Sequence, residues 1–325
     1  MSYFCTDPKQ NPQRYSKFPK NFFVTPGRKY YPNPGTINNI HKKVFDIIPH
    51  YLDGVELWMK KGLAPNKTLI TNWTLSHTTP SEFHIGGIYN WRCRGNILET
   101  PTIECNINPS TLTSNFKLTY YPISSFKIES QFSHIGNENF KTLGIQNVTS
   151  LEYTKPYSTT NFCLYDPKKE AGQLTVSYLR SVTKKLALGS EFFFEWLNKG
   201  ITTKIALAAK YNENKRAIAG TITIDALDLS YWHQIHKSIQ MGTLFAFNRC
   251  SKKAYGALCY QYDFNSGTTI RGMIDSDCSV GFMYERSSMT MPCLMGFNLL
   301  FCIPTGRFTI GLKLNFDPTI RCNTK

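Results

Sequence analysis

Apolar and polar residues alternate with a period of two through most of the chain after Gly54. The final run shows this most clearly, because Phe308, Ile310, Leu312, Leu314 and Phe316 alternate with Arg307, Thr309, Gly311, Lys313 and Asn315. Successive side chains of a β-strand point to opposite faces, so the run predicts a strand with one apolar face. Turn-like segments at 212–215, 248–253, 265–267 and 304–306 separate several such runs. The pattern predicts an antiparallel meander.

The number of candidate strands limits the architectures that this meander can adopt. About 19 strands fit between Gly54 and Phe316, with ambiguous boundaries across 98–160. A β-sandwich rarely needs so many, and no repeat of ~40–50 residues marks propeller blades. A long meander hides its edges by closing, and closure is compulsory in lipid because no water satisfies an open edge. We therefore predict an all-β transmembrane antiparallel β-barrel.

One helix is expected before the strands. Thr36 stands at an N-cap position, and Pro49 ends the segment. Apolar residues fall on one face at helical spacing, namely Ile37, Ile40, Val44, Ile47 and Ile48. A spanning helix is not expected in the uncharged stretch 287–306, because the apolar part between Pro292 and Pro304 is far short of the ~20 residues that a bilayer requires.

Charge is concentrated at the N-terminal end of the chain. The formal net charge is +15, and residues 1–43 hold eight Lys or Arg against one Asp. Residues 1–32 are also rich in Pro, Asn and aromatics without clean periodicity, so we predict a disordered basic arm there. The predicted organisation is the arm at 1–32, a helix segment at 33–50, the barrel at 51–317 and a tail at 318–325.

Catalytic and metal-binding patterns are missing from the sequence. There is no G-x-S-x-G, P-loop, H-E-x-x-H or Rossmann glycine pattern, and the ten cysteines form no C-x-x-C. His233 and His236 would point to opposite faces of a strand. We expect no enzyme, no cofactor and no metal site, and free thiols of a reducing compartment rather than disulfides.

Several passages, in order, resemble the channel-forming subunit of the mitochondrial outer-membrane protein translocase, the TOM complex. They are Asn33-Pro34-Gly35-Thr36, His41-Lys42-Lys43-Val44, Gly54-Val55-Glu56-Leu57, Lys61-Gly62-Leu63, the segment 174–192 and Ala206-Leu207-Ala208-Ala209-Lys210-Tyr211. The likeness covers residues 33–92 and 172–316. It is poor across 98–160, and the arm has no counterpart, so the chain looks like a divergent paralogue.

This resemblance implies a 19-stranded barrel whose first and last strands pair in parallel, with the N-terminal helix inside the pore. It implies multi-pass insertion in the mitochondrial outer membrane and a complex with a receptor subunit, small single-helix subunits and further copies of the chain. It also implies a C-terminal sorting signal of a polar residue, a glycine and two hydrophobics, which Thr309, Gly311, Leu314 and Phe316 match.

The alternation also predicts which charged residues line the pore. If the apolar positions face lipid, the opposite parity faces water. The acidic candidates for holding a basic presequence are then Glu56, Glu191, Glu195, Asp225, Asp228, Asp263, Asp275 and Glu285. The basic residues expected beside them are Lys60, Lys185, Lys204, Lys210, Arg271, Arg307 and Lys313. Met273 and Met283 are candidate apolar contacts for a presequence.

Three functions fit these expectations. The first is a channel that imports unfolded precursors with basic presequences by weak, multi-site binding. The second is a non-conducting paralogue that serves as a barrel scaffold in the translocase. The third is a metabolite pore like the voltage-dependent anion channel. Nucleic-acid binding through the basic arm is a remote fourth possibility, because the arm carries no RNA-binding motif, and no nucleic-acid partner is expected.

Overall fold

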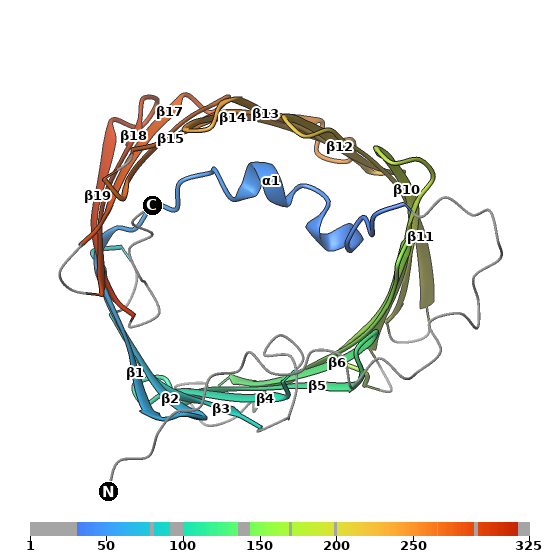
Figure 1. The fold of residues 1–325 in the computed structure, drawn as a ribbon, viewed down its shortest axis with the longest axis horizontal. Coiled ribbons are helices and arrows are strands. Elements are labelled where there is room, and N and C mark those ends of the chain that lie inside the picture. The colour runs from blue at the N-terminus through green and yellow to red at the C-terminus, as the bar shows by residue number, and fades with distance from the viewer. Residues whose placement is uncertain are drawn as a thin grey trace, which may run out of the picture.

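The computed structural model describes residues 31–78, 81–91, 100–135, 144–168, 171–197, 200–264, 266–288 and 292–317. These residues form a single closed sheet of 19 strands, which encloses a lumen (Figure 1). The strands β1 and β19 close the barrel in parallel, with Gly54 opposite Gly311 and Met59 opposite Phe316. All other neighbours pair antiparallel in chain order. The predicted fold, strand number and closure are confirmed.

The strands follow one another with short connections. Their bounds are β1 Gly54–Ala64, β2 Lys67–Leu75, β3 Glu82–Asn90, β4 Thr102–Asn108, β5 Thr113–Ile123, β6 Phe126–Ile135, β7 Gly144–Lys155, β8 Ser158–Tyr165, β9 Ala171–Ser181, β10 Leu186–Leu197, β11 Gly200–Asn212, β12 Arg216–Thr223, β13 Ala226–His236, β14 Ile239–Asn248, β15 Lys253–Asp263, β16 Thr268–Asp275, β17 Ser279–Ser287, β18 Cys293–Cys302 and β19 Arg307–Phe316.

The barrel has two mouths, which we name by the turns they contain. The β1–β2 mouth holds the turns at 65–66, 124–125, 156–157, 182–185, 213–215 and 237–238. The β2–β3 mouth holds the start of β1 and the turns at 109–112, 224–225, 249–252, 276–278 and 303–306. Within the described residues, no helix is long and apolar enough to cross a membrane.

The outward face of the strands is mostly apolar. In β19, Phe308, Ile310, Leu312 and Phe316 are exposed on this face, whereas Gly311 on the other face is buried. Aromatic side chains are sorted along the strands, as expected for girdles at two membrane interfaces. Outward tyrosines lie toward the β1–β2 mouth, at Tyr89, Tyr120, Tyr153, Tyr178, Tyr211, Tyr262 and Tyr284. The outward aromatic residues at the β2–β3 mouth are Trp and Phe, at Trp73, Phe83, Trp196, Phe247, Phe301 and Phe308, although outward Phe126 and Phe316 lie at the β1–β2 mouth.

The N-terminal segment, residues 31–53, lies inside the barrel (Figure 1). The continuous helix predicted over 37–48 is wrong in its length, because the segment forms a 3-10 turn η1 at Ile37–Asn39 and one α-helical turn α1 at Lys42–Phe45. Thr36 makes no side-chain cap to the backbone and instead accepts a hydrogen bond from Asn39 Nδ2 at 3.0 Å. Packing against the barrel wall, rather than intrinsic helicity, holds so short an element.

The five aliphatic residues of the predicted helix face still contact the barrel wall. Ile37 and Ile40 pack with Leu179, Ala187, Ala208 and Ala219. Val44 and Ile47 pack with Ala217, Trp232, Ala257, Cys259 and Met273, and Ile48 lies partly buried beside them. Small wall residues leave room for this close approach, as at Gly242, where an added Cβ would lie 3.1 Å from Val44 Cγ1.

Polar contacts show the route of the N-terminal segment from one mouth to the other. At the β1–β2 mouth, Asn33 Nδ2 donates to the Lys155 carbonyl at 2.6 Å, and Ser181 Oγ donates to the Pro32 carbonyl at 2.7 Å. At its other end, Asn298 Nδ2 donates to the Leu52 carbonyl at 3.0 Å, just before β1 begins. The segment therefore runs along the inner wall from the β1–β2 mouth to the start of β1, where the chain enters the sheet.

We expect Val44→Asp to release the N-terminal segment, whereas Phe45→Asp should not. Val44 is 1% exposed within an apolar cluster, but the adjacent Phe45 is 48% exposed toward the lumen. A carboxylate buried without a partner is strongly disfavoured. Trypsin cleavage after Lys42 and Lys43 should therefore accelerate by about tenfold or more in the first variant only. Equal acceleration in both variants would show that the segment is not held by this face.

Candidate functional site: the lumen

The N-terminal segment covers one part of the inner barrel wall and leaves another part facing the lumen. The covered wall comprises β9–β17, where all of the apolar contacts described above are made. The open wall comprises β2–β7, on the far side of the pore from α1 (Figure 1). A molecule that passes through the barrel therefore meets the open wall on one side and the exposed face of the N-terminal segment on the other.

Seven of the eight acidic residues predicted to face inward lie on inward strand positions. Glu56 forms an ion pair with Lys313 at 3.5 Å across the parallel seam, and Glu285 pairs with Arg271 at 3.5 Å. Asp263 accepts hydrogen bonds from Gln261 and Thr269 at 2.9 and 3.0 Å. The others are Glu191, Glu195, Asp228 and Asp275. Five basic candidates also lie on inward strand positions, at Lys60, Lys204, Lys210, Arg271 and Lys313, and Arg307 begins β19 with the same parity.

Two predicted lumen residues lie instead in turns at the mouths. Asp225 is in the β12–β13 turn and pairs with Lys204 at 3.0 Å. The hydrogen bond from Lys204 holds the pKa of the Asp225 carboxyl below its ordinary value. Lys185 is in the β9–β10 turn and pairs with Glu213. Parity alone placed these two residues inside, because the alternation continues past the end of the hydrogen-bonded strand.

Two candidate apolar contacts for a presequence are covered. Met273 packs against Val44 and Ile47 in the apolar cluster, and it is 8% exposed. Met283, also on the inward face, is 3% exposed. The expectation that these methionines offer an apolar surface to a presequence is therefore wrong for the lumen as this structure shows it. Phe45 is the large apolar side chain of the N-terminal segment that is exposed in the lumen.

The open wall carries four inward acidic residues that the sequence analysis missed, namely Glu82, Glu104, Glu129 and Glu152. Three of them alternate with lysines across neighbouring strands. Glu104 is directly opposite Lys117, Lys117 Nζ lies 2.9 Å from Glu129, and Glu152 is directly opposite Lys127. Neighbouring inward positions are mostly amides and hydroxyls, including Asn72, Asn106, Asn115, Gln131, Ser150 and Asn161.

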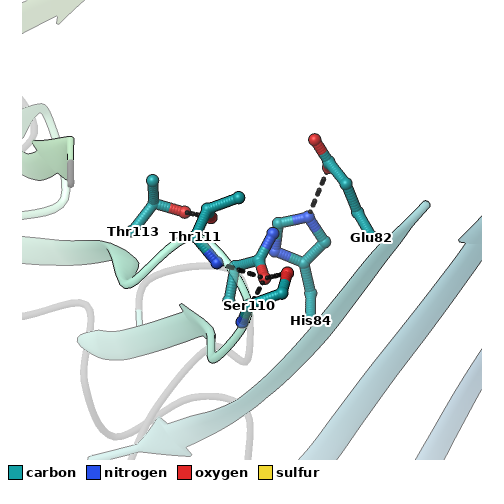
Figure 2. Close-up of polar contacts among 6 residues, drawn as sticks. Glu82, His84, Ser110, Thr111 and Thr113 are labelled. Carbon is teal, nitrogen blue, oxygen red and sulfur yellow. Dashed lines mark hydrogen bonds and ion pairs between the residues drawn. The ribbon is translucent and has the colours of Figure 1, made fainter. Parts of the chain in front are cut away.

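Glu82 lies at the β2–β3 mouth of the open wall. Its Oε2 lies 2.9 Å from Nε2 of His84, two residues along β3 (Figure 2). The same figure shows Ser110, Thr111 and Thr113 at the nearby β4–β5 turn, where Thr111 and Thr113 hydroxyls are 3.0 Å apart. This rim of the open wall is therefore polar and carries a titratable pair.

The residues of the predicted sorting signal lie on both faces of β19. Thr309 and Gly311 face the lumen, whereas Leu314 and Phe316 face outward. An added Cβ at Gly311 would lie 2.3 Å from the Leu52 carbonyl oxygen and 2.1 Å from Asn298 Oδ1. Gly311 thus lets the N-terminal segment approach the seam, which is a packing reason for glycine in addition to any signal.

Within the described residues, no three His, Cys, Asp or Glu side chains lie together as metal ligands. Acidic and basic side chains line the wall in similar numbers, and most of the acids named above are paired or hydrogen-bonded. A closed barrel with a mostly apolar outer face, aromatic residues near both mouths and a polar, charged lumen is the architecture of a channel-forming membrane protein.

Comparison with known proteins gives the family. The model of the eukaryotic porin family matches residues 33–301, and the chain belongs to that family. The mitochondrial import receptor subunit TOM40 homolog of Caenorhabditis briggsae is 26% identical over 292 residues, covering 86% of this chain and 94% of that protein. The Homo sapiens TOM40 homolog is 24% identical over 294 residues, covering 87% and 78%. A mutant Rhodopseudomonas blastica porin structure covers 70% of this chain and 94% of its own at 11% identity, with a TM-score of 0.44.

Proposed function

We propose that the chain is the protein-conducting channel through which unfolded precursors cross the mitochondrial outer membrane. The observation that carries this proposal is the open wall, a hydrophilic surface that lies across the lumen from the N-terminal segment and runs from mouth to mouth (Figure 1). An extended polypeptide can pass along such a wall because its backbone groups find amide, hydroxyl and charged partners. The similarity to import receptor subunits named TOM40 supports the same conclusion.

Cargo binding in this proposal is weak and repeated. Basic presequences meet acidic side chains at several depths, and each exposed ion pair contributes only ~0.2–1 kcal/mol, so release is rapid. Partner proteins give the transport its direction. On the basis of the family resemblance, we propose that these partners are a receptor subunit, small single-helix subunits and further copies of the chain. The basic arm is predicted at 1–32, and its residues 1–30 lie outside the described part of the chain; we propose that its positive charge attracts an acidic partner.

A presequence peptide should block the current through the reconstituted chain, and open-wall carboxylates should contribute most to the block. The open-wall set is Glu82→Gln, Glu104→Gln, Glu129→Gln and Glu152→Gln. The matched set is Asp225→Asn, Asp228→Asn, Asp263→Asn and Asp275→Asn, which removes the same charge from the covered wall and a mouth. Both sets should weaken the block, the open-wall set by about tenfold in Kd, whereas single changes should barely alter it.

The same planar-bilayer recording separates this proposal from its two alternatives. We expect cation preference or little selectivity, and a block that weakens as salt rises. Strong anion selectivity without peptide block would favour a metabolite pore, which requires a basic lumen. No current from a correctly inserted barrel would favour a scaffold. A larger effect of the covered-wall set would contradict the assignment of the path to the open wall.

A further inference from the structure

Charged side chains on the outward face of the barrel are distributed unevenly. The described strands place no acidic residue on this face. Lysine and arginine occupy six outward strand positions, all exposed and all at the β1–β2 mouth: Lys61, Lys67, Lys155, Arg180, Arg216 and Arg286. They come from β1, β2, β7, β9, β12 and β17, so they are spread around the whole perimeter. We call these six residues the basic girdle.

Four of the six residues of the basic girdle lie close to a tyrosine of the same face. Lys155, Arg180 and Arg286 each follow an outward tyrosine by two residues, at Tyr153, Tyr178 and Tyr284. Lys67 is directly opposite Tyr89. Two residues along a strand are about 6.6 Å, so each of these four cations lies one same-face step outside a tyrosine or beside it. Lys155 Nζ also lies 5.2 Å from the ring centre of Tyr153.

This arrangement matches the depth profile of a membrane leaflet. Tyrosine rings sit at the interface between acyl chains and headgroups, and long cationic side chains extend from there toward the phosphates. We propose that the basic girdle binds the headgroups of anionic phospholipids in the leaflet at the β1–β2 mouth. A leaflet surrounds every strand, whereas a single protein partner would contact only one sector of a girdle spread over the perimeter.

The opposite mouth shows the contrast that this proposal requires. Its outward positions on the described strands carry no Lys or Arg, and they include Trp73, Trp196 and Phe308. On the outward strand face, the attraction to anionic lipid therefore acts at the β1–β2 mouth, and it favours one orientation in a bilayer whose leaflets differ in charge. The girdle faces away from the lumen, so the proposal is independent of what passes through the pore.

Electron spin resonance of spin-labelled lipids tests the proposal directly. The full chain is reconstituted in phosphatidylcholine with a trace of spin-labelled phosphatidylglycerol or spin-labelled phosphatidylcholine, and the motionally restricted fraction of each is compared. We expect a several-fold preference for phosphatidylglycerol at low salt that declines as salt rises. Equal restricted fractions for the two lipids at low salt would overturn the proposal.

A pair of triple variants assigns the preference to the girdle. Lys155→Gln, Arg180→Gln and Arg286→Gln together should reduce it toward unity. Lys117→Gln, Lys127→Gln and Lys313→Gln remove the same charge from inward positions and should leave the preference unchanged. Circular dichroism and heat-modified migration in gels verify that each barrel is folded. The salt dependence of the lipid preference is measured on the unmodified chain, so that part of the test does not depend on the folding of any variant. Equal loss of preference in both variants would refute the assignment.

Inorganic phosphate distinguishes headgroups in a leaflet from free anions. Phosphate should reduce the lipid preference no more than chloride does at the same ionic strength, because soluble anions lack the high local concentration of a leaflet. Selective loss of the preference in phosphate would show a site for a soluble anion and would overturn the proposal.

Discussion

Phe132→Arg is expected to lower the free energy of unfolding of the membrane-inserted barrel by about 2–4 kcal/mol, whereas Gln131→Arg should change it little. The two residues are neighbours near the middle of β6, and both side chains are exposed in the isolated barrel. Phe132 faces outward beside Phe116, at a ring distance of 6.4 Å. Gln131 faces the lumen directly opposite Lys117. The same arginine therefore enters hydrocarbon in one variant and water in the other.

Denaturant titration in lipid vesicles, followed by tryptophan fluorescence, measures this difference between the variants. The comparison cancels effects that the introduced arginine itself has on both faces. A larger loss of stability for Gln131→Arg than for Phe132→Arg would reverse the assignment of inward and outward faces. That result would be incompatible with a lipid-facing surface on β6.

Gly311→Val combined with Phe316→Ser is expected to prevent insertion of the newly made chain, reducing the carbonate-resistant fraction in isolated mitochondria by about tenfold or more. This expectation rests on the spacing of a polar residue, a glycine and two hydrophobic residues in the last strand, at Thr309, Gly311, Leu314 and Phe316. The matched control is Gly296→Val with Phe297→Ser, which makes the same changes on β18, where an added Cβ at Gly296 meets its nearest neighbour at 3.4 Å.

Because Gly311 also makes room for Leu52, failure of the double variant has two explanations, a lost signal and a steric clash. A synthetic peptide of residues 303–317 separates them. As a competitor, it should slow insertion of the unmodified chain, and the peptide with both substitutions should not. If neither peptide competes while the double variant still fails, the motif acts through packing and is not a sorting signal.

The barrel could be predicted from the sequence because its signal is repeated in most strands. The alternation from Phe308 to Phe316 matches β19 residue for residue, and parity correctly placed Asp263 and Glu285 on inward positions. The parallel pairing of β1 with β19 was available only through the family resemblance. Alternation describes one strand at a time and carries no information on which strands meet.

Other features depend on contacts that no local pattern records. The helix face from Ile37 to Ile48 was identified, yet its division into η1 and α1 follows from the shape of the wall beneath it. Across β4–β8 the outward face includes polar residues such as Ser130, Asn147 and Thr149, so the alternation there is weak. This weakness hid Glu104, Glu129 and Glu152, and hence most of the acidic residues of the open wall.

Photocrosslinking of an arrested precursor is the most direct test of protein conduction through this lumen. A presequence-bearing precursor fused to a tightly folded domain would be held in the pore, with benzoylphenylalanine introduced into the barrel at the position of Gln131 or of Phe132. Protein conduction through the lumen should give an adduct with the precursor from position 131 and none from position 132. No adduct from position 131, or equal adducts from both, would contradict it.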